Sequence, residues 1–371
     1  MKFVSLFFLL LFWSNQVFAT RDLETIWGKI TVEDPVIEKL LESPVMQRIK
    51  NIDQSGPVAY FDLMPKFSRY DHSVGVWYLL KKVGAPRKEQ IAGLLHDVSH
   101  TAFSHIAEEV FQIEDDHKSY QDKIHLWFLK EMQIEKYLQN VIPISDLDPD
   151  LPQYTALEQD LPHMCADRIE YVLHTSYLLG LIDEEKLHLI TNNLNFENDR
   201  WFFTDAKIAE DFAALSLDLT QDIFGSGWNR VMYHYFASAI RYAMSKDIIT
   251  KEEFNFGTDL VVLKKLQNSG DPYINYILNL CSDLKNAYKI SNKENHDLKI
   301  TTKFRGINPL VCDNQNCRKL SKIDPDFKDR FEKIQKWCKN GYYVKLDDSN
   351  PAQSDILELS LYFKNLLHKK N

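Results

Sequence analysis

The sequence predicts an all-α fold: a bundle-like helical core with minor β hairpin elements and a small α+β C-terminal region. From about residue 33 to residue 250, apolar residues recur mostly at the spacing of amphipathic helices. After about residue 292, short alternating stretches indicate strands instead. The chain has 371 residues, of which 44% are apolar, and this is enough to bury a core without disulfides or a structural metal.

The helices are predicted in order along the chain. The segment 34–52 opens with an Asp-Pro pair, typical of an N-cap followed by a first-turn proline, and continues with helically spaced apolar residues. A second helix is expected at 87–96. Prolines among acidic residues predict an irregular segment at 142–162, after which a helix spans 163–179.

The pattern changes after this helix. Aromatic residues that follow an Asn-Asp turn predict a small hairpin at 193–205, and helical spacing returns at 205–246. Alternation at 298–304 and at 342–346 predicts strands around a helix near residues 326–338. We therefore separate a main domain, residues 20–291, from a C-terminal α+β appendage, residues 292–371.

Residues 1–19 have the pattern of a secretory signal peptide. Lys2 precedes an uncharged apolar run, and small residues lead to a candidate cleavage site after Ala19. The run is too short to cross a bilayer comfortably, so we expect no stable membrane span after its removal. We expect a periplasmic or secreted protein if the signal is functional and a cytoplasmic one otherwise. The alternative is a buried or membrane-associated N-terminal segment.

The net charge and the cysteines narrow the function. A charge of −9 argues against a protein that grips nucleic acid, because phosphate-backbone binding needs a basic face. Of the five cysteines, Cys312 and Cys317 are close enough in sequence for a local disulfide if the protein is exported, and Cys165 is expected to be free. A zinc site built on cysteines is not expected, since no second ligand-spaced pair follows.

The candidate site depends on a few histidines and aspartates. His96 and Asp97 are adjacent at the end of an apolar helix, where neighbouring side chains can converge on one ion. A lone His-Asp pair is a weak signal, but His72 lies upstream in the run Arg-Tyr-Asp-His-Ser and Asp167 downstream in Ala-Asp-Arg. The alternative is that these residues cap helices or fill polar niches in the core.

This H…HD…D pattern resembles the HD-domain metal-dependent phosphohydrolases, and within that superfamily it is most similar to the deoxynucleoside triphosphate triphosphohydrolase branch. The runs at residues 43–56, 69–76 and 92–105 carry the match, which covers roughly residues 26–180. The resemblance implies that residues 20–291 form an HD phosphohydrolase domain. It also implies a homo-oligomer, because members of this branch commonly assemble into oligomers.

The four residues suit one divalent metal ion. Two imidazoles and two carboxylates fit Mn, Fe, Co, Ni, Zn or a permissive Mg site, because nitrogen ligands favour transition ions. They leave positions on a six-coordinate ion for a phosphate oxygen and a water, whose pKa the metal would lower. We therefore expect His72, His96, Asp97 and Asp167 to bind one ion, whose identity the sequence leaves open.

The resemblance implies three catalytic residues near the metal. His100 matches a family histidine that works near the phosphates together with an acidic neighbour, and Glu108 stands where the family often has an acidic residue. His117 matches a family histidine proposed to donate a proton to the leaving group. This role suits an imidazole because its pKa lies close to working pH. The alternative for His117 is a solvated loop histidine.

Further residues are expected to bind the substrate. Arg69 is the candidate phosphate clamp, because a guanidinium makes planar, bidentate contacts with phosphate oxygens. Tyr171 lies one helical turn after Asp167, so its hydroxyl is expected to face the same cavity. Through the resemblance, Gln54 corresponds to a residue that meets the sugar and His105 to a residue near the substrate.

Two positions qualify this assignment. Arg168 matches a family basic residue that contacts phosphates, but it can instead be a surface arginine paired with an acidic neighbour. Ser55 stands where deoxynucleotide-selective members usually have a larger apolar residue. That departure puts selectivity for deoxyribose in doubt.

These residues lead to three hypotheses. The first is a metal-dependent phosphohydrolase acting on a nucleotide or another small phosphate ester, most specifically a (deoxy)nucleoside triphosphate triphosphohydrolase that uses a metal-activated water. The second is an HD phosphodiesterase or phosphomonoesterase, which two tightly held ions would favour. The third is a nucleotide-binding regulator without turnover.

Overall fold

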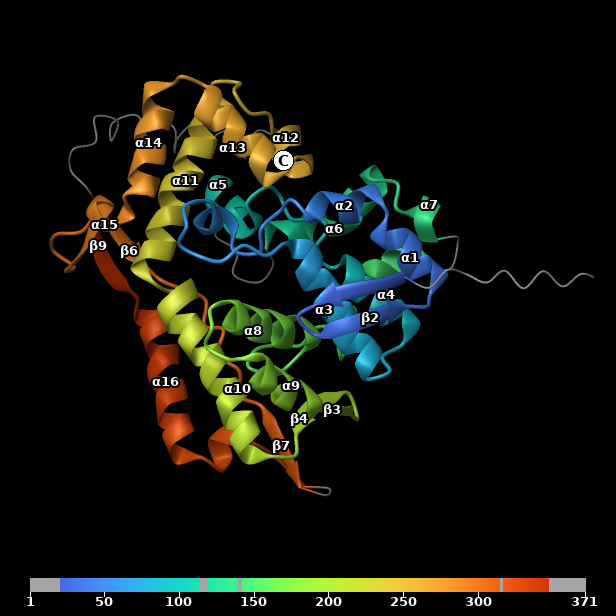
Figure 1. The fold of residues 1–371 in the computed structure, drawn as a ribbon. Coiled ribbons are helices and arrows are strands. Elements are labelled where there is room, and N and C mark those ends of the chain that lie inside the picture. The colour runs from blue at the N-terminus through green and yellow to red at the C-terminus, as the bar shows by residue number, and fades with distance from the viewer. Residues whose placement is uncertain (1–20, 114–118, 139–141, 314–315, 347–371) are drawn as a thin grey trace, which may run out of the picture.

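The computed structural model describes residues 21–113, 119–138, 142–313 and 316–346 (Figure 1). The signal-like segment and His117 therefore lie outside the described residues. Within the described ranges the fold is mostly helical with a few small sheets, as the sequence predicts. No helix in these ranges is both long enough and apolar enough to cross a bilayer.

An N-terminal hairpin precedes the first helices, although the sequence pattern did not indicate it. It consists of the antiparallel strands β1 (Arg21–Thr25) and β2 (Gly28–Val32). Where one helix is predicted over residues 34–52, the structure has two, α1 (Pro35–Leu41) and α2 (Pro44–Ile49). The interruption falls at Ser43-Pro44, because proline disfavours the helical conformation in the residue before it.

The next helices carry the candidate site. α3 (Arg69–Lys82) begins with a capping box, in which Ser68 and Asp71 exchange side-chain and backbone hydrogen bonds. α4 (Arg87–Leu95) confirms the predicted second helix and ends at its C-cap residue, His96. The following elements are η2 (Ser104–Ile106), α5 (Ala107–Val110), α6 (Tyr120–Glu131), α7 (Glu135–Leu138) and η3 (Ile144–Leu147).

Helix α8 (Ala166–Leu178) lies centrally, against α3 and α10 (Figure 1). It begins later than predicted, because Cys165 has an extended backbone and serves as its N-cap. The predicted hairpin is confirmed and follows α9. These elements and the next helices are α9 (Glu184–Asn192), β3 (Leu194–Glu197), β4 (Arg200–Phe203), α10 (Ala206–Asp218), the π-helical η4 (Leu219–Phe224) and α11 (Gly227–Ser245).

The remaining chain packs against this helical body. It continues with α12 (Lys251–Phe256), α13 (Asp259–Asn268), α14 (Pro272–Ser282) and α15 (Leu284–Ala287). Strands β5 (Tyr288–Ser291), β6 (Leu298–Ile300) and β9 (Tyr342–Leu346) form a sheet in the order β5-β9-β6. The strand predicted at 298–304 is therefore shorter than expected, and the chain beyond it is irregular as far as β7.

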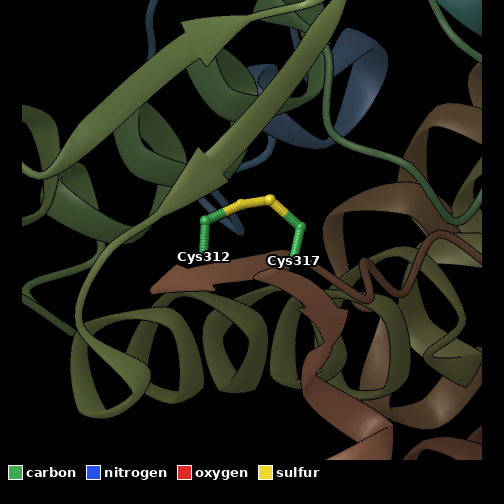
Figure 2. The surroundings of a disulfide bond; sticks show 2 residues. All are labelled: Cys312 and Cys317. Atoms are coloured by element: carbon green, nitrogen blue, oxygen red, sulfur yellow. A yellow bond between two sulfur atoms is a disulfide. The ribbon is translucent and has the colours of Figure 1, made fainter. Parts of the chain in front are cut away.

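The last hairpin joins the C-terminal region to the main domain. Strand β7 (Leu310–Asp313) pairs in parallel with β4, and β8 (Asn316–Lys319) pairs antiparallel with β7. Cys312 and Cys317 face each other across this hairpin and form the disulfide that their spacing allows (Figure 2). Cys165 is free, as the sequence led us to expect. After η5 (Leu320–Lys322), the predicted helix α16 (Pro325–Asn340) runs beside α10 (Figure 1).

Buried apolar residues form two clusters. One contains residues of the N-terminal hairpin, α1–α4, α8 and α10, and includes Leu95 and Val98. The other is built around α11, α13 and α14, and includes Ala102 and Phe103. The chain thus crosses from one cluster to the other between Val98 and Ala102, which places His96 and Asp97 close to the boundary.

Candidate metal centre

The four predicted metal ligands come from three helices and converge. His72 lies in the first turns of α3, His96 and Asp97 follow the last residue of α4, and Asp167 lies in the first turn of α8. Nε2 of His72 is 3.0 Å from Oδ1 of Asp167 and 3.4 Å from Oδ2 of Asp97. Nε2 of His96 is 3.6 Å from Oδ1 of each aspartate.

The separations among His72, His96 and Asp97 fit ligand atoms around one cation, and Asp167 approaches both histidines without belonging to that group. Two ligands at right angles, each about 2.1 Å from an octahedral ion, are about 3 Å apart. His72, His96 and Asp97 form a group whose atoms can share an ion, and Nε2 of His96 is buried without a hydrogen-bond partner. Although burial lowers the pKa of His72, the neighbouring carboxylates of Glu170 and Asp167 raise it to about 10. A divalent cation would balance the negative charge of these carboxylates and take the place of the proton on Nε2 of His72.

Glu170 orients His72 and is a site residue that the sequence analysis missed. Its carboxylate is hydrogen-bonded to Nδ1 of His72 and, at 2.6 Å, to Nδ1 of His174. An ionised carboxylate only accepts, so Nδ1 of His72 carries the proton and Nε2 keeps its lone pair for the cation. Glu170 comes three residues after Asp167, so the two side chains share one face of α8. This spacing could have predicted from the sequence that Glu170 lies near the metal ligands.

Gly75 makes room for this carboxylate. It lies one turn after His72 in α3, and a Cβ at this position would come within 2.3 Å of Oε1 of Glu170. Glycine inside a helix destabilises it by about 1 kcal/mol relative to alanine. The close approach of Glu170 explains why glycine occupies the position nevertheless.

Arg69 is almost fully buried and contacts protein groups. Its guanidinium forms an ion pair with Asp97, and its Nε donates to Oγ of Ser104 at 2.8 Å. Another guanidinium nitrogen reaches the carbonyl oxygen of Gln54 at 3.4 Å. Against the effect of burial, the charges of Arg69 and the nearby histidines hold the pKa of Asp97 well below its usual value. Arg69 thus fixes Asp97, and with five N–H donors it retains capacity for a phosphate oxygen.

A strained turn follows Asp97. Phe103 and Ser104 have left-handed φ values of 62° and 57°. Each such non-glycine residue costs about 1 kcal/mol or more, so surrounding contacts must hold it. Oδ1 of Asp259 accepts from the Phe103 amide at 2.6 Å, and the Ser104 hydroxyl donates to the carbonyl oxygen of Asp53. Strain of this kind is typical of functional sites.

The turn brings His105 next to His100. Their rings meet edge to face with centroids 4.8 Å apart, and Nε2 of His100 is 3.2 Å from Oδ1 of Asp97. Burial and the charge of Arg69 lower the pKa of His100 to about 4. The same two causes lower the pKa of His105 well below its usual value. Both imidazoles are therefore neutral at pH 7.

Three other predicted residues have buried polar atoms without a partner. These atoms are Oε1 of Gln54, Oε2 of Glu108 and the hydroxyl of Tyr171. The other oxygen of Glu108 accepts from the amide of Tyr120 at 2.9 Å. Buried polar groups are normally hydrogen-bonded, so such a set beside the four converging side chains is typical of a binding site.

Arg168 contacts an acidic neighbour. It donates to Oε1 of Glu158 at 2.6 Å and to the carbonyl oxygen of His163 at 3.1 Å. Arg168 thus forms an ion pair with an acidic neighbour, which was the alternative to a phosphate contact. It is not a surface residue, however, because its side chain is only 11% exposed. Glu158, Cys165 and Asp167 form a second group whose atoms could share an ion. Because Arg168 already neutralises Glu158 and burial raises the pKa of the Cys165 thiol, this group suits a cation poorly.

Two residues of the C-terminal region that the sequence analysis missed are relevant here: Arg305, and Lys303, whose pKa is lowered by burial and by the charges of Arg305 and Arg168. The guanidinium of Arg305 lies 5.9 Å from the ring centroid of Phe224, and that ring lies 6.1 Å from the ring of Tyr171. Lys303 precedes Arg305 by two residues. Both residues lie far from the HD motif in sequence, so no local pattern connected them with the site. His117 is the one predicted site residue outside the described ranges.

Comparison with known proteins agrees with this geometry. The HD domain family matches residues 69–137 of the chain. The uncharacterized protein YdhJ of Bacillus subtilis is 32% identical over 325 residues, which cover 87% of this chain and 98% of that protein. The metal-dependent phosphohydrolase cns2 of Cordyceps militaris is 30% identical over 172 residues, which cover 46% of this chain and only 49% of that protein.

More distant relatives extend the comparison. The deoxynucleoside triphosphate triphosphohydrolase SAMHD1 homolog of Dictyostelium discoideum is 26% identical over 42% of this chain and 36% of its own length. A crystal structure of a hypothetical protein from Aquifex aeolicus has the same fold, with a TM-score of 0.66 at 14% identity over 92% of this chain and all of that chain. The chain therefore belongs to the HD-domain superfamily of metal-dependent phosphohydrolases, and within it resembles the deoxynucleoside triphosphate triphosphohydrolase branch.

Proposed function

We propose that this protein releases triphosphate from (deoxy)nucleoside triphosphates with one divalent cation held by His72, His96, Asp97 and Asp167. The observation that carries the proposal is the convergence of these side chains at 3.0–3.6 Å around a buried, unpartnered imidazole nitrogen. Arg69 and neutral imidazoles beside them suit a phosphate group. The likeness to a deoxynucleoside triphosphate triphosphohydrolase supports a nucleotide as the substrate.

The reaction would divide between the cation and the chain. When bound, the cation lowers the pKa of a water and offsets charge on the phosphoryl group. Arg69 fixes Asp97 and offers its remaining N–H groups to a phosphate oxygen. A nearby phosphate raises the pKa of His100, so its ring can take up a proton and deliver it to the leaving oxygen. Glu108 and His117 are the other proposed participants in this proton transfer.

The sugar side of the site includes Gln54 and Ser55. The buried Oε1 of Gln54 has no protein partner, which supports a contact with a sugar hydroxyl. The carbonyl oxygen of Ser55 accepts from the hydroxyl of Tyr233 at 3.0 Å. The short side chain of Ser55 offers less bulk than the apolar residue usual at this position, so we expect ribonucleotides to be accepted as well.

A substrate screen tests the proposal. Purified protein is incubated with nucleoside tri-, di- and monophosphates and cyclic nucleotides, each with Mn, Co, Fe or Mg, and the products are resolved by chromatography. Inorganic triphosphate and nucleoside are the expected products, and they should be missing with His96→Ala. No turnover of any substrate with any ion would sink the enzyme hypothesis. A nucleotide that binds stoichiometrically and is recovered intact would establish the regulator instead.

The second candidate is a phosphodiesterase or phosphomonoesterase, for which Glu158, Cys165 and Asp167 would have to hold a second ion although Arg168 already pairs with Glu158. The ion count per chain separates the two candidates. One tightly bound ion supports the triphosphohydrolase, and two support the phosphodiesterase.

We further propose that the protein is exported and forms a homo-oligomer. The Cys312–Cys317 disulfide supports export, because disulfides persist in oxidising compartments. Mass spectrometry of the protein from its native cells should find Thr20 at the N-terminus, and retention of Met1 would contradict export. Light scattering of the purified protein measures the oligomer.

A further inference from the structure

An irregular segment of the C-terminal region, residues 301–309, is seated tightly against the main domain. A Cβ on Gly225 would come within 2.9 Å of the side chain of Thr302, and a Cβ on Gly306 within 2.7 Å of Leu217. The amide of Ile307 donates to Oγ of Ser216 at 2.9 Å. These contacts on both sides fix the backbone at Arg305.

Arg305 is connected to the candidate site through two aromatic rings. Its guanidinium packs on Phe224, and Phe224 meets Tyr171 edge to face. Tyr171 follows Asp167 by one turn of α8 and presents a buried hydroxyl without a partner. The series Asp167, Tyr171, Phe224 and Arg305 therefore leads outward from the proposed metal ligands. Burial, then the charges of Arg69 and His100, and after them the charge of Arg305 lower the pKa of His105.

Three cations, Arg168, Lys303 and Arg305, gather here, and the carboxylates that act on Lys303 are those of Asp122 and Glu158. Among the described residues, Arg168 has Glu158 as its ion-pair partner, whereas neither Arg305 nor Lys303 forms an ion pair. Burial and then the charges of Arg305 and Arg168 lower the pKa of Lys303. Like charges held close together destabilise one another unless an anion lies between them, so their convergence beside a binding site indicates an anionic ligand.

We propose that Arg305, assisted by Lys303, binds the phosphates of the substrate that lie beyond the phosphate at the metal centre. The inference rests on the proposed function and explains why its substrate needs a chain of at least two phosphates. A monophosphate ester held at the metal ligands and Arg69 would leave the guanidinium of Arg305 without a partner. The C-terminal region thus supplies a substrate-positioning residue to the HD domain.

Binding of inorganic phosphates tests this without requiring turnover. Tripolyphosphate and orthophosphate are titrated by calorimetry into the full chain without added divalent cation, so that chelation of free ions contributes no heat. Loss of a charge-assisted hydrogen bond should lower the tripolyphosphate affinity of Arg305→Gln at least about tenfold. Orthophosphate affinity should change less than about threefold, and Arg305→Lys should restore part of the loss because it keeps the charge.

Two further variants make the result decisive. Arg200→Gln removes the same charge from an exposed position on β4 and should bind tripolyphosphate like the wild type. If Arg305→Gln fails to fold by circular dichroism, the exposed Lys303→Gln decides, with a loss of about threefold or more expected. The inference is overturned if a folded Arg305→Gln binds tripolyphosphate as tightly as the wild type. If Arg305→Gln does not fold, the same result for Lys303→Gln overturns it.

The outcome separates the inference from the proposed function. If tripolyphosphate binding depends on Arg305 but no nucleotide is hydrolysed, the inference stands and the triphosphohydrolase fails. If nucleoside triphosphates are hydrolysed and Arg305→Gln keeps the wild-type KM, the function stands and the inference fails. When both hold, Arg305→Gln should raise KM for triphosphates more than it lowers kcat.

Discussion

The buried carboxylate of Glu170 is hydrogen-bonded to Nδ1 of His72, on the opposite side of the ring from Asp167. This contact fixes the tautomer of His72 and aims Nε2 at the proposed cation. The carboxylate also binds His174, whose ring stacks on Phe67 with centroids 4.3 Å apart. The orientation of one proposed ligand thus depends on a residue that does not itself reach the cation.

Glu170→Gln should weaken metal binding. An amide in place of the carboxylate holds the imidazoles less firmly and lowers ligand basicity, and changes of this kind typically reduce metal affinity by about 10–100-fold. Titration of the metal-depleted protein with Mn²⁺ or Zn²⁺ measures the effect. Glu131→Gln, at an exposed position on α6, is the matched control and should bind metal normally. Equal affinities in the two variants would contradict the role of Glu170.

Gly75→Ala should weaken metal binding in the same way. Alanine normally favours a helix over glycine by about 1 kcal/mol, so a simple propensity argument expects a more stable protein. Here the new Cβ would fall 2.3 Å from Oε1 of Glu170 and must displace that carboxylate. Denaturant unfolding and metal titration should both show a loss. A variant that is more stable and binds metal normally would show that Glu170 can move without consequence.

His96→Ala should abolish metal binding at little cost in stability. Nε2 of His96 has no hydrogen-bond partner, so the substitution removes a ligand and breaks one hydrogen bond, from Nδ1 to the carbonyl oxygen of Gly93. Metal content by mass spectrometry should fall, and activity should drop at least about a thousandfold if the cation stabilises the transition state by several kcal/mol. Wild-type protein stripped by a chelator should lose activity and regain it with metal, whereas the variant should not respond.

His125 should make the protein less stable at acidic pH. Burial lowers its pKa to about 4, and its ring contacts Ser99 and the carbonyl oxygen of Leu147. The unfolded chain takes up a proton near pH 6.5 and the folded chain only near pH 4, so this stability is present above pH 6.5 and lost as pH falls toward 4. Between pH 7 and pH 5 the loss should be about 2 kcal/mol.

Urea unfolding of the wild type and His125→Gln at both pH values measures this contribution. The variant has no titrating ring here, so the difference between the two proteins should shrink by about 2 kcal/mol on going to pH 5. A difference that does not change with pH would mean that the buried ring is protonated at little cost.

Reduction of the Cys312–Cys317 disulfide should lower stability modestly. The two cysteines are separated by only 5 positions, and closing so short a loop stabilises the folded state by about 2 kcal/mol in the chain-entropy description. Thermal unfolding with and without a reductant measures the loss. The double variant Cys312→Ser with Cys317→Ser should unfold at the temperature of the reduced protein and ignore the reductant.

Local patterns were sufficient for several helices, among them α4, α8 and α16, and for the four converging residues. The Asp-Pro start of α1, the apolar run of α4 and the His-Asp pair at its end are all readable without knowledge of distant contacts. The break at Ser43-Pro44 follows from a property of proline and could have been predicted. It was missed because apolar residues keep a helical spacing on both sides of it. The N-terminal hairpin lacked a distinctive alternation, and its strands are recognisable only from their pairing.

The sequence by itself determined the helical class, the HD motif and the residues that meet at its centre. Each of these depends either on the local spacing of residues or on a short continuous motif. Only the tertiary structure decided that Glu170 supports His72, that Gly75 admits this carboxylate, and that Arg168 is paired with Glu158. It also brought Arg305 from the C-terminal region to Phe224 and Tyr171. Most of these relationships join residues far apart in the chain, and their geometry arises when packed helices fix which side chains share one buried space.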